Sequence, residues 1–508
     1  MHKKNMFMNS ISNVIYLIIT TIFSIIIRKF LIDFLGVEIL GLNGVVVELI
    51  NTLSLSELGI QTAIIFRLYE PVAQKEYTRE GEIFTLFKKA YLIIGCVIFF
   101  AGIVMLPMLK YVIDLSISMS IVYLVYMVQL STVVLSYCTS YYRVIFLVHE
   151  QQYFCSRIDI VVQIVSYILQ IFMLIIFKNY IAYLLIDSAR VITGNTLIKR
   201  ECKKKFSYVF DKYSVALADK KNLFGDLKEI LFGNIAGYVY SSTDSILISI
   251  FGTTVMVGFL SNYKMITTMI RTLVTTINNS IAPTWGAYLH KETEYVRVEE
   301  KYRKYNFIQF VECCFLLIPV ICLSDGFIEM MFGEAYVIRS SLLYLIVADI
   351  YIQNIHEPNA VIIRGKGLFR QDKVVSIIAT FVNVSFSIIL ANYWGAEGVL
   401  TGTLCALLVF WGMRSWYVHK ECRFSRKSFI TYWLLNFFHI LEFVFYVFVV
   451  KNIIKIISLK NVFLELLIQG IMVECIVFLF LVVLYGRNKW IRDEMRKIFK
   501  LRRIEQND

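Results

Sequence analysis

Residues 90–109 read AYLIIGCVIFFAGIVMLPML, which is 20 positions without a charged side chain between Lys89 and Lys110. An α-helix needs about 20 apolar residues to cross the hydrocarbon core of a bilayer, since each residue adds about 1.5 Å of length. This stretch therefore predicts a membrane-spanning helix. Runs of similar composition recur along the whole chain, so the same argument extends from residues 90–109 in both directions.

Fourteen runs are long and apolar enough to be candidate spans. They are 9–32, 40–66, 84–109, 117–147, 155–177, 181–198, 229–250, 255–288, 305–323, 340–362, 374–391, 396–418, 430–450 and 462–485. We therefore predict an all-α polytopic membrane protein with about 14 transmembrane helices. The run 181–198 is unusual because it contains Asp187 and Arg190, and the run 255–288 is unusually long.

The composition excludes other protein classes. Of the 508 residues, 58% are hydrophobic and 18% are charged, whereas soluble domains have roughly 45–50% and about 25%. The 39 Phe and 31 Tyr argue against a disordered chain. The ten Cys lack the paired spacing of a disulfide scaffold. A net charge of +13 does not require nucleic acid as a partner, because membrane proteins carry basic residues in their cytoplasmic loops.

The distribution of Lys and Arg predicts the orientation in the membrane. When the connections between spans are assigned alternately to the two sides, 40 of the 51 basic residues fall on one side and 8 on the other. The remaining three, Arg190, Lys264 and Arg271, lie within spans. Because basic residues concentrate in cytoplasmic loops, this asymmetry predicts an even number of spans with both termini in the cytoplasm.

Short motifs recur at nearly one offset and predict an internal duplication. In the first, an apolar-Gly turn is followed by a second Gly that begins the next span. In the second, an Asp precedes an Asn-Tyr pair by 20 residues. The matches are Gly36 with Gly252, Gly41 with Gly258, Asp159 with Asp372, and Pro71 with Pro283, at offsets of 212 to 217.

We therefore predict two six-helix lobes that are parallel repeats about an axis along the membrane normal. Such repeats build alternating-access transporters with a site between the lobes. The predicted parts are an N-lobe at 1–205, a basic cytoplasmic linker at 206–228, a C-lobe at 229–425, two appended helices within 426–485 and a basic cytoplasmic tail at 486–508.

Five segments carry a resemblance to a known family. They are FLGVEILGL at 34–42, LSELGI at 55–60, LYEP at 68–71, STDSILIS at 242–249 and VGFLSNY at 257–263. With two six-helix lobes and two further helices, the chain resembles the Wzx-type flippases. These are the polysaccharide transporters of the multidrug/oligosaccharidyl-lipid/polysaccharide exporter superfamily.

The chain departs from two other branches of that superfamily. Residues 45–51 lack the Pro-Asn and paired arginines that are typical of the lipid II flippase branch. Residues 9–32 lack the proline that is typical of drug-extruding relatives. The similarity is therefore to the branch that handles capsule, exopolysaccharide or O-antigen repeat units.

The resemblance implies a function. An undecaprenyl-pyrophosphate-linked oligosaccharide would move from the cytoplasmic to the outer leaflet of a bacterial plasma membrane by alternating access. The implied partners are this lipid, the bilayer, a proton or sodium ion for coupling, and a polysaccharide polymerase. We expect no cofactor, no metal site and no nucleic acid.

Four basic residues are candidates for binding the pyrophosphate or acidic sugars. Lys264 and Arg271 lie seven residues apart on one face of a span. Arg190 lies near mid-membrane, and Arg28 lies near the outer end of the first span. Such side chains are expected to face a water-filled passage between the lobes, because a charge in lipid is costly.

Each of these cations also has a structural interpretation. Lys264 could pair with Asp244 at a similar depth, and Asp187 could pair with Arg190 on the same helix. Arg28 could extend to the outer headgroups. For Arg271 the sequence offers no evident partner, so we predict that it faces the passage.

Three intramembrane carboxylates, Asp349, Glu57 and Asp244, are candidates for ion coupling. Asp349 lies near the midplane without a basic residue close to it in the sequence. The alternative for each is a neutral carboxylic acid that is hydrogen-bonded to a neighbouring helix.

Two other functions compete with the flippase. A multidrug or cation antiporter of the same superfamily should have an acidic or apolar cavity rather than a basic one. A membrane polysaccharide polymerase, which is an enzyme, usually carries a large outer loop with catalytic residues. The longest predicted outer loop here spans only about residues 325–339, and the chain has no catalytic or nucleotide-binding motif. We therefore expect a transporter rather than an enzyme.

Overall fold

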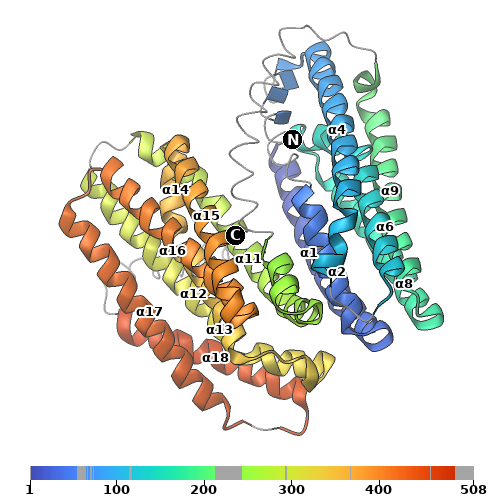
Figure 1. Cartoon of the computed structure of the whole chain (residues 1–508). Helices are drawn as coiled ribbons and strands as arrows, with labels where there is room; N and C mark the ends of the chain where they lie inside the picture. The colour runs from blue at the N-terminus through green and yellow to red at the C-terminus, as the bar shows by residue number, and fades with distance from the viewer. Residues whose placement is uncertain are drawn as a thin grey trace, which may run out of the picture. The chain divides into compact units, whose positions relative to one another are not determined.

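The computed structural model is helical and has no strands in the part of the chain that it describes (Figure 1). The described residues are 2–53, 64–65, 67–68, 71–72, 74–113, 117–211, 243–291, 295–366, 368–457 and 459–486. Within them, 10 helices are long and apolar enough to cross a membrane. The all-α polytopic fold class is thereby confirmed.

These ten helices coincide with ten of the fourteen predicted runs. Two of the other runs, 40–66 and 229–250, extend beyond the described residues. The run 255–288 lies in α11 (Thr254–Lys291), a single helix of 38 residues. The run 340–362 is divided into α13 (Ser340–Ile355) and α14 (Glu357–Gly365), because Pro358 at the start of α14 cannot continue the preceding helix. The count of fourteen spans stays a prediction.

The chain divides into two compact units. Unit 1 comprises Met1–Ser261 and Thr380–Gly402, and unit 2 comprises Asn262–Ala379 and Thr403–Asp508. The division into lobes and linker that the sequence suggests stays a prediction.

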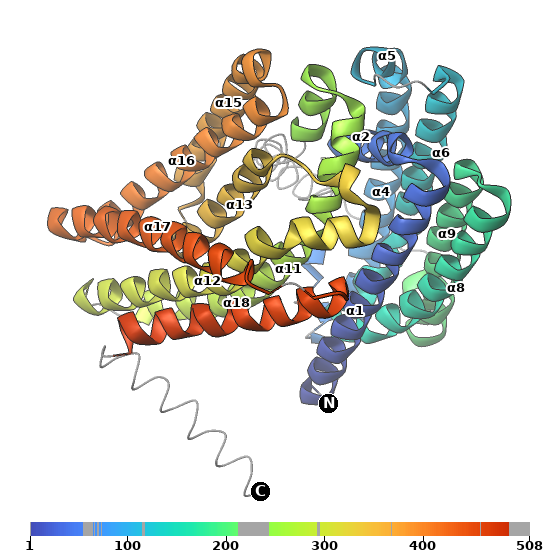
Figure 2. The same cartoon turned by 90° about the horizontal axis from the view of Figure 1, so that it is seen from below.

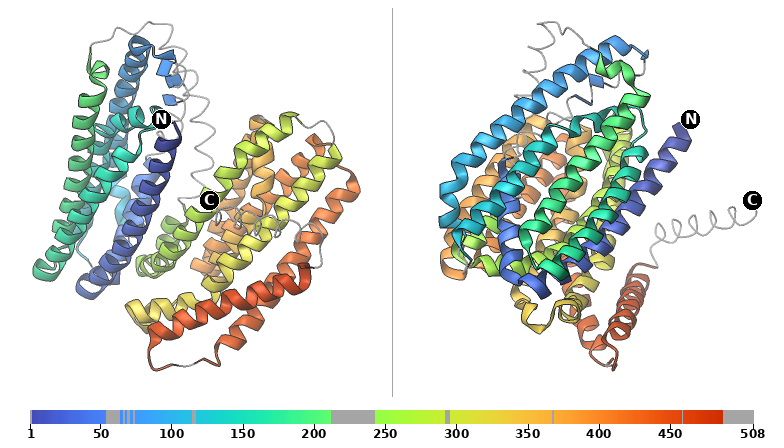
Figure 3. Two further views of the ribbon diagram at one scale, coloured as in Figure 1. Left: turned by 180° about the vertical axis from the view of Figure 1, so that it is seen from behind. Right: turned by 90° about the vertical axis from the view of Figure 1, so that its right-hand side faces the viewer.

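Unit 1 contains helices that run side by side (Figures 1 and 3). They are α1 (His2–Leu35), α2 (Val37–Leu53), α4 (Tyr77–Met105), α5 (Leu109–Val112), α6 (Met119–Tyr137), α7 (Arg143–Val148), α8 (Tyr153–Phe177) and α9 (Tyr180–Lys205), with short 3-10 turns η2 (Leu106–Met108), η3 (Ser140–Tyr142) and η4 (Ser207–Phe210). Helix α8 packs against α1 and α9, and α6 packs against α9 and α4.

In unit 2, α12 (Tyr295–Phe332) packs against α13, α17 (Arg426–Ile454) and α18 (Val462–Tyr485), as Figure 2 shows. The short turn η5 (Glu334–Tyr336) follows α12. Helices α11, α15 (Phe369–Trp394) and α16 (Ala396–Glu421) each contribute residues to both units.

Several of these helices bury polar residues and expose apolar ones. On α8, the buried residues include Gln163, Ser166 and Gln170, whereas Phe172 and Phe177 are exposed. Helix α17 likewise buries a polar stripe that includes Ser428, Tyr432, Asn436 and His439. A soluble helix has the opposite pattern, because lipid, unlike water, does not drive apolar side chains inward. Polar groups in a bilayer instead find their partners on neighbouring helices.

The helix pairs α8–α9 and α15–α16 are joined by turns of the same kind. Lys178 has a φ of 46° and Gly395 a φ of 56°, so both backbones are left-handed at the turn. The Oδ1 of Asn179 then accepts hydrogen bonds from the N–H groups of Ile181 and Ala182 and caps α9. Lys178 and Gly395 lie 217 residues apart, which matches the offset of the sequence motifs.

The two glycines that follow the repeated turns lie against each other's helices within unit 1. A Cβ added to Gly41 of α2 would overlap the carbonyl oxygen of Thr254, and one added to Gly258 of α11 would lie 2.8 Å from that of Val37. Small residues permit such close approach of two helix backbones in a membrane. The second Gly of each motif is therefore required by the crossing of α2 and α11.

We predict that Gly41→Ala lowers the stability of the protein in detergent by about 1–3 kcal/mol, because the added methyl group forces the two backbones apart. The measurement is the thermal unfolding of the purified protein. Gly412→Ala is the matched control, since a Cβ at this helical glycine meets nothing within 4 Å. The control should be neutral or should gain about 1 kcal/mol of helix propensity. Equal melting temperatures for Gly41→Ala and the wild type would contradict the close backbone contact between α2 and α11.

Candidate functional site

Unit 1 holds an arginine at the point where a membrane-spanning segment is interrupted. The segment 119–148 breaks between α6 and α7, and Arg143 begins α7. Its Nη1 and Nη2 donate to the two carboxylate oxygens of Asp159 on α8, at 2.6 and 2.8 Å. Its Nε donates to Oδ1 of Asn195 on α9 at 2.9 Å. A two-pronged pair of this kind fixes both the position and the plane of the guanidinium.

A second arginine, Arg190, lies one turn before Asn195 on α9. Its Nε donates to Asp187 at 2.8 Å, so the pair expected from the three-residue spacing is present. Its Nη1 donates to Oε1 of Gln163 on α8 at 3.1 Å. Helix α8 thus contributes a polar partner to both Arg143 and Arg190.

Both arginines line one cavity of about 320 Å³ within unit 1. Asp159, Asn195, Ser136, Ser140 and Tyr141 are also among its lining residues. The side chains of Arg143 and Arg190 remain 35% and 27% exposed, respectively. The cavity therefore offers accessible guanidinium N–H groups among hydroxyl and amide groups, which is the chemistry that binds an anionic, hydrogen-bonding ligand.

In unit 2, the structure brings together two residues that the sequence predicted separately. The guanidinium of Arg271 on α11 donates to the carboxylate of Asp349 on α13 and to the side-chain oxygen of Gln353. The sequence offered no evident partner for Arg271 and no basic residue close to Asp349, and the structure makes the two residues partners of each other. The two residues are 78 positions apart, so only the packing of α11 on α13 makes them neighbours.

The other predicted residues lie in different places. Arg28 donates to the hydroxyl of Ser261 on α11, so it points into unit 1, and its extension to the lipid headgroups is not observed. Lys264 lies two turns before Arg271 on α11 and is partly buried. Asp244 lies in the helical segment 243–251, where the neighbouring Thr243 donates to Oδ1 of Asn383 at 3.3 Å. Glu57 lies outside the described residues.

Two arginine–aspartate pairs were missed by the sequence reasoning. One is Arg143–Asp159 in unit 1. The other is Arg414–Asp372 in unit 2, with 2.8 Å between Nε and Oδ1, and there Nη1 of Arg414 also contacts Nε2 of His356 at 3.1 Å. Both arginines lie near the ends of apolar runs, so they were assigned to cytoplasmic connections. The available signal was Asp159 and Asp372 themselves, which recur at an offset of 213 within predicted spans or beside them.

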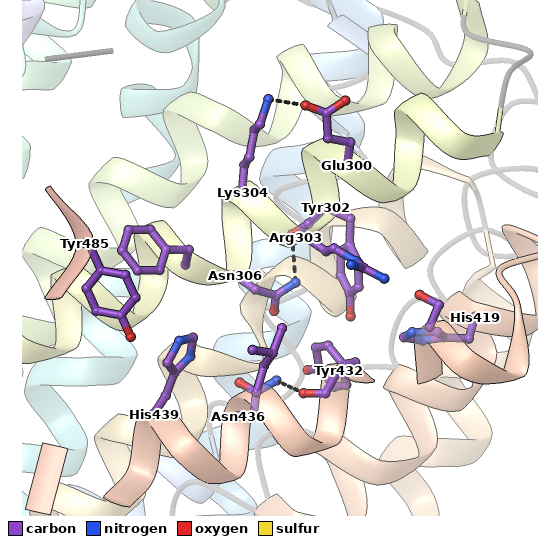
Figure 4. Close-up of a pocket in the computed structure, with 13 residues that line it drawn as sticks. Glu300, Tyr302, Arg303, Lys304, Asn306, His419, Tyr432, Asn436, His439 and Tyr485 are labelled. Atoms are coloured by element: carbon purple, nitrogen blue, oxygen red, sulfur yellow. Dashed lines mark hydrogen bonds and ion pairs between the residues drawn. The ribbon is translucent and has the colours of Figure 1, made fainter. Parts of the chain in front are cut away.

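Unit 2 also contains a cavity of about 360 Å³ between α12, α16, α17 and α18 (Figure 4). Glu300 and Lys304 form an ion pair at its edge, at 2.5 Å. Four side-chain atoms around it are buried and have no hydrogen-bond partner in the described structure. They belong to Asn306, His419, Asn436 and His439.

We predict energetic coupling between Arg271 and Asp349 in a double-mutant cycle. Arg271→Gln and Asp349→Asn should each lower the melting temperature, and the double variant should lose less than the sum. The coupling energy should lie between about 0.5 and 3 kcal/mol, since the groups share one polar site.

The control cycle uses Arg303 and Glu299, an i,i+4 pair on α12 whose arginine is 47% exposed. That pair should couple by about 0.5 kcal/mol or less. Strict additivity at Arg271 and Asp349 would show that the contact does not contribute to stability.

Comparison with known proteins relates this geometry to a family. The family model described as "Polysaccharide biosynthesis protein" matches residues 4–288. No curated protein matches the chain by sequence.

Solved structures match the fold over most of the chain. The lipid II flippase MurJ in an inward closed conformation has a TM-score of 0.65 at 11% identity and covers 94% of this chain and 98% of its own. An inward-facing multidrug resistance MATE transporter of the MOP superfamily has a TM-score of 0.64 at 13% identity, covering 80% and 96%. A point mutant of the Vibrio cholerae MATE transporter VcmN has a TM-score of 0.58 at 14% identity, covering 84% and 98%.

At these identities the solved structures establish a shared fold. These structures are described as a flippase and as transporters. The family model covers more than half of the 508 residues. The chain belongs to the polysaccharide biosynthesis protein family.

Proposed function

We propose that this protein is a flippase for undecaprenyl-pyrophosphate-linked oligosaccharide repeat units. It moves them from the cytoplasmic to the outer leaflet of the bacterial plasma membrane by alternating access, for the synthesis of capsule, exopolysaccharide or O-antigen. The family and the flippase-like fold support transport of a polysaccharide precursor. The choice of an anionic lipid carrier rests on the arginines inside the membrane-spanning helices.

The observation that carries the proposal is that these arginines are paired but accessible. Arg143, Arg190 and Arg271 each contact an aspartate, and their side chains are 35%, 27% and 37% exposed. An arginine exposed to hydrocarbon is strongly unfavourable. The exposed parts of Arg143 and Arg190 face a cavity with polar walls, so water or a polar ligand is their partner.

Arg143 retains hydrogen-bonding capacity for a ligand. A guanidinium has five N–H donors, and the three contacts with Asp159 and Asn195 use three of them. The aspartate keeps the cation oriented when no substrate is bound. A pyrophosphate can then accept from the remaining N–H groups, or it can replace the carboxylate, because the planar fork of arginine fits phosphate oxygens.

The same cations disfavour the antiport of cationic drugs. A cationic substrate that entered the unit 1 cavity would meet two guanidiniums and the carboxylate of Asp159, which Arg143 already occupies, so no carboxylate in the lining is left to bind it. Substrate charge therefore distinguishes the two transporter classes.

Asp244 is our proposed ion-coupling residue in unit 1. Buried polar side chains lie close to its helix, since Thr243 donates to the fully buried Asn383. Asp349 is bound by Arg271, so its proposed role in coupling would require that pair to open. A role of Glu57 in ion coupling stays a prediction.

We predict that Arg143→Gln and Arg190→Gln each abolish or strongly reduce surface polysaccharide when they replace the wild-type protein in its host. Each substitution removes charge-assisted hydrogen bonds to the pyrophosphate and should weaken binding about tenfold or more. Surface polysaccharide is measured by immunoblotting, and binding of undecaprenyl pyrophosphate to the purified protein is measured by native mass spectrometry.

Lys204→Gln serves as the matched control, because Lys204 pairs with Glu201 within α9 and lines neither the unit 1 cavity nor the cavity of Figure 4. It should leave both readouts unchanged. Normal surface polysaccharide at normal membrane levels of Arg143→Gln and Arg190→Gln would refute the proposed binding role.

For coupling, Asp244→Asn should reduce the dependence of transport on the pH or sodium gradient in proteoliposomes, because the amide cannot take up a proton or balance the charge of a sodium ion. The readout is substrate translocation with and without the imposed gradient. Unchanged dependence on both gradients would remove Asp244 from the proposal.

A further inference from the structure

Three polar residues of α12, spaced by three positions, each leave a buried oxygen unpartnered. These oxygens are Oδ1 of Asn306, Oε1 of Gln309 and Oε1 of Glu312, and none has a hydrogen-bond partner among the described residues. The side chains of Asn306 and Gln309 are 6% and 0% exposed. Successive residues of the series rise by about 4.5 Å along the helix, so the three oxygens form a row of acceptors along α12.

The surrounding hydrogen bonds fix which end of each amide faces which neighbour. Nε2 of Gln309 donates to Oδ1 of Asn278 on α11 and to Oε2 of Glu312, both at 3.0 Å. Exchanging the two ends of the Gln309 amide would set its oxygen against two acceptors. Nδ2 of Asn306 donates to the carbonyl oxygen of Tyr302 at 2.8 Å. The unpartnered atoms are therefore acceptors by necessity.

The carboxylate of Glu312 makes this excess of acceptors costly. The side-chain amide of Gln309 is the one donor that contacts it among the described side chains. Glu312 is partly buried with its Oε1 fully covered, and a carboxylate so placed with so few donors is destabilised relative to water. What the site lacks is a positive charge, because a further neutral donor would leave the negative charge uncompensated.

Three carboxylates on the helices packed around α12 have partners in the described structure, whereas His439 on α17 and Glu474 on α18 are further titratable groups there. Asp349 on α13 is held by Arg271, and Glu357 on α14 is paired with Arg364 at 2.5 Å. Glu442 on α17 accepts from the hydroxyl of Tyr485 on α18 at 2.6 Å. On α12 itself the titratable neighbours of Glu312 are Tyr305 and Cys313. Of these, Tyr305 donates to Asn278 at 3.1 Å.

The row of acceptors begins at the cavity of Figure 4. Asn306 lines that cavity together with His419 and Asn436. Nδ1 of His419 donates to the carbonyl oxygen of Ser415 at 2.7 Å, so its buried Nε2 offers a lone pair. Oδ1 of Asn436 is unpartnered as well. A cation that enters the cavity thus meets acceptors there first and then those of Asn306, Gln309 and Glu312 in turn.

We propose that Glu312 and Gln309 form a binding site for a monovalent cation, a proton or a sodium ion, which enters through the cavity and past Asn306. The cation neutralises Glu312 and satisfies the unpartnered oxygens. That this binding drives transport rests on the proposed function, whereas the binding itself does not. The site is distinct from Asp244 and from the Arg271–Asp349 pair.

Infrared spectroscopy of the purified protein in nanodiscs tests the site without any lipid substrate. In choline chloride we expect a protonated carboxyl band that disappears as the pH rises and that is absent from Glu312→Gln. If sodium competes with the proton, the midpoint pH falls by about one unit for each tenfold rise in sodium concentration. If the proton alone binds, the midpoint is independent of sodium.

Glu442→Gln is the matched control, since it removes another intramembrane carboxyl group that already has a donor. It should keep the Glu312 band. Asn306→Leu should keep the band and slow its response to a pH jump by about tenfold, because the approach loses one polar contact. This variant also tests the site if Glu312→Gln fails to fold.

Two results would overturn the proposal. One is a carboxyl spectrum of Glu312→Gln identical to that of the wild type at every pH and sodium concentration. The other is an unchanged response rate in Asn306→Leu, which would exclude the entry path. Intact ion binding without ion-dependent transport would count against the proposed coupling and would leave the cation site standing.

Discussion

A charged side chain within a membrane-spanning helix must find an opposite charge or a dense set of hydrogen bonds, and this constraint organises both units. Each of four arginines is held by an aspartate: Arg143 by Asp159, Arg190 by Asp187, Arg271 by Asp349 and Arg414 by Asp372. Three of these pairs join two different helices. They therefore help to set how the helices pack, in addition to keeping the cations compatible with the bilayer.

The same constraint acts within unit 1, where α4 meets the residues that follow α9. The carboxylate of Glu80 is buried, accepts from the hydroxyl of Tyr208 at 2.8 Å and contacts Nε2 of His149 at 2.9 Å. Burial, and after it the Glu80 carboxylate, raise the pKa of Tyr208, so its hydroxyl stays a donor. The turn η4 is thereby tied to α4 and to the end of α7. In both units, large apolar side chains are exposed as well as buried, and most of the buried polar groups find partners on neighbouring elements.

The two units contain two kinds of polar site, one with accessible arginines and one with unpartnered acceptors. The unit 1 cavity presents N–H donors with positive charge and suits an anion. The row of acceptors on α12 presents oxygens next to a carboxylate and suits a cation. A transporter that couples the movement of an anionic lipid to a cation gradient needs both kinds of site. The membership of the polysaccharide biosynthesis protein family is consistent with this pairing.

The sequence by itself determined the membrane class, the all-α fold, most of the spans and the Asp187–Arg190 pair, because each follows from apolar run length or from helical spacing over a few residues. It also marked Asp159 and Asp372, although not their arginines. Only the tertiary structure decided that Arg271 pairs with Asp349 and that Arg28 meets Ser261, 233 positions away. Such contacts depend on how separate helices rotate and cross, and lipid-facing apolar surfaces carry little information about that rotation.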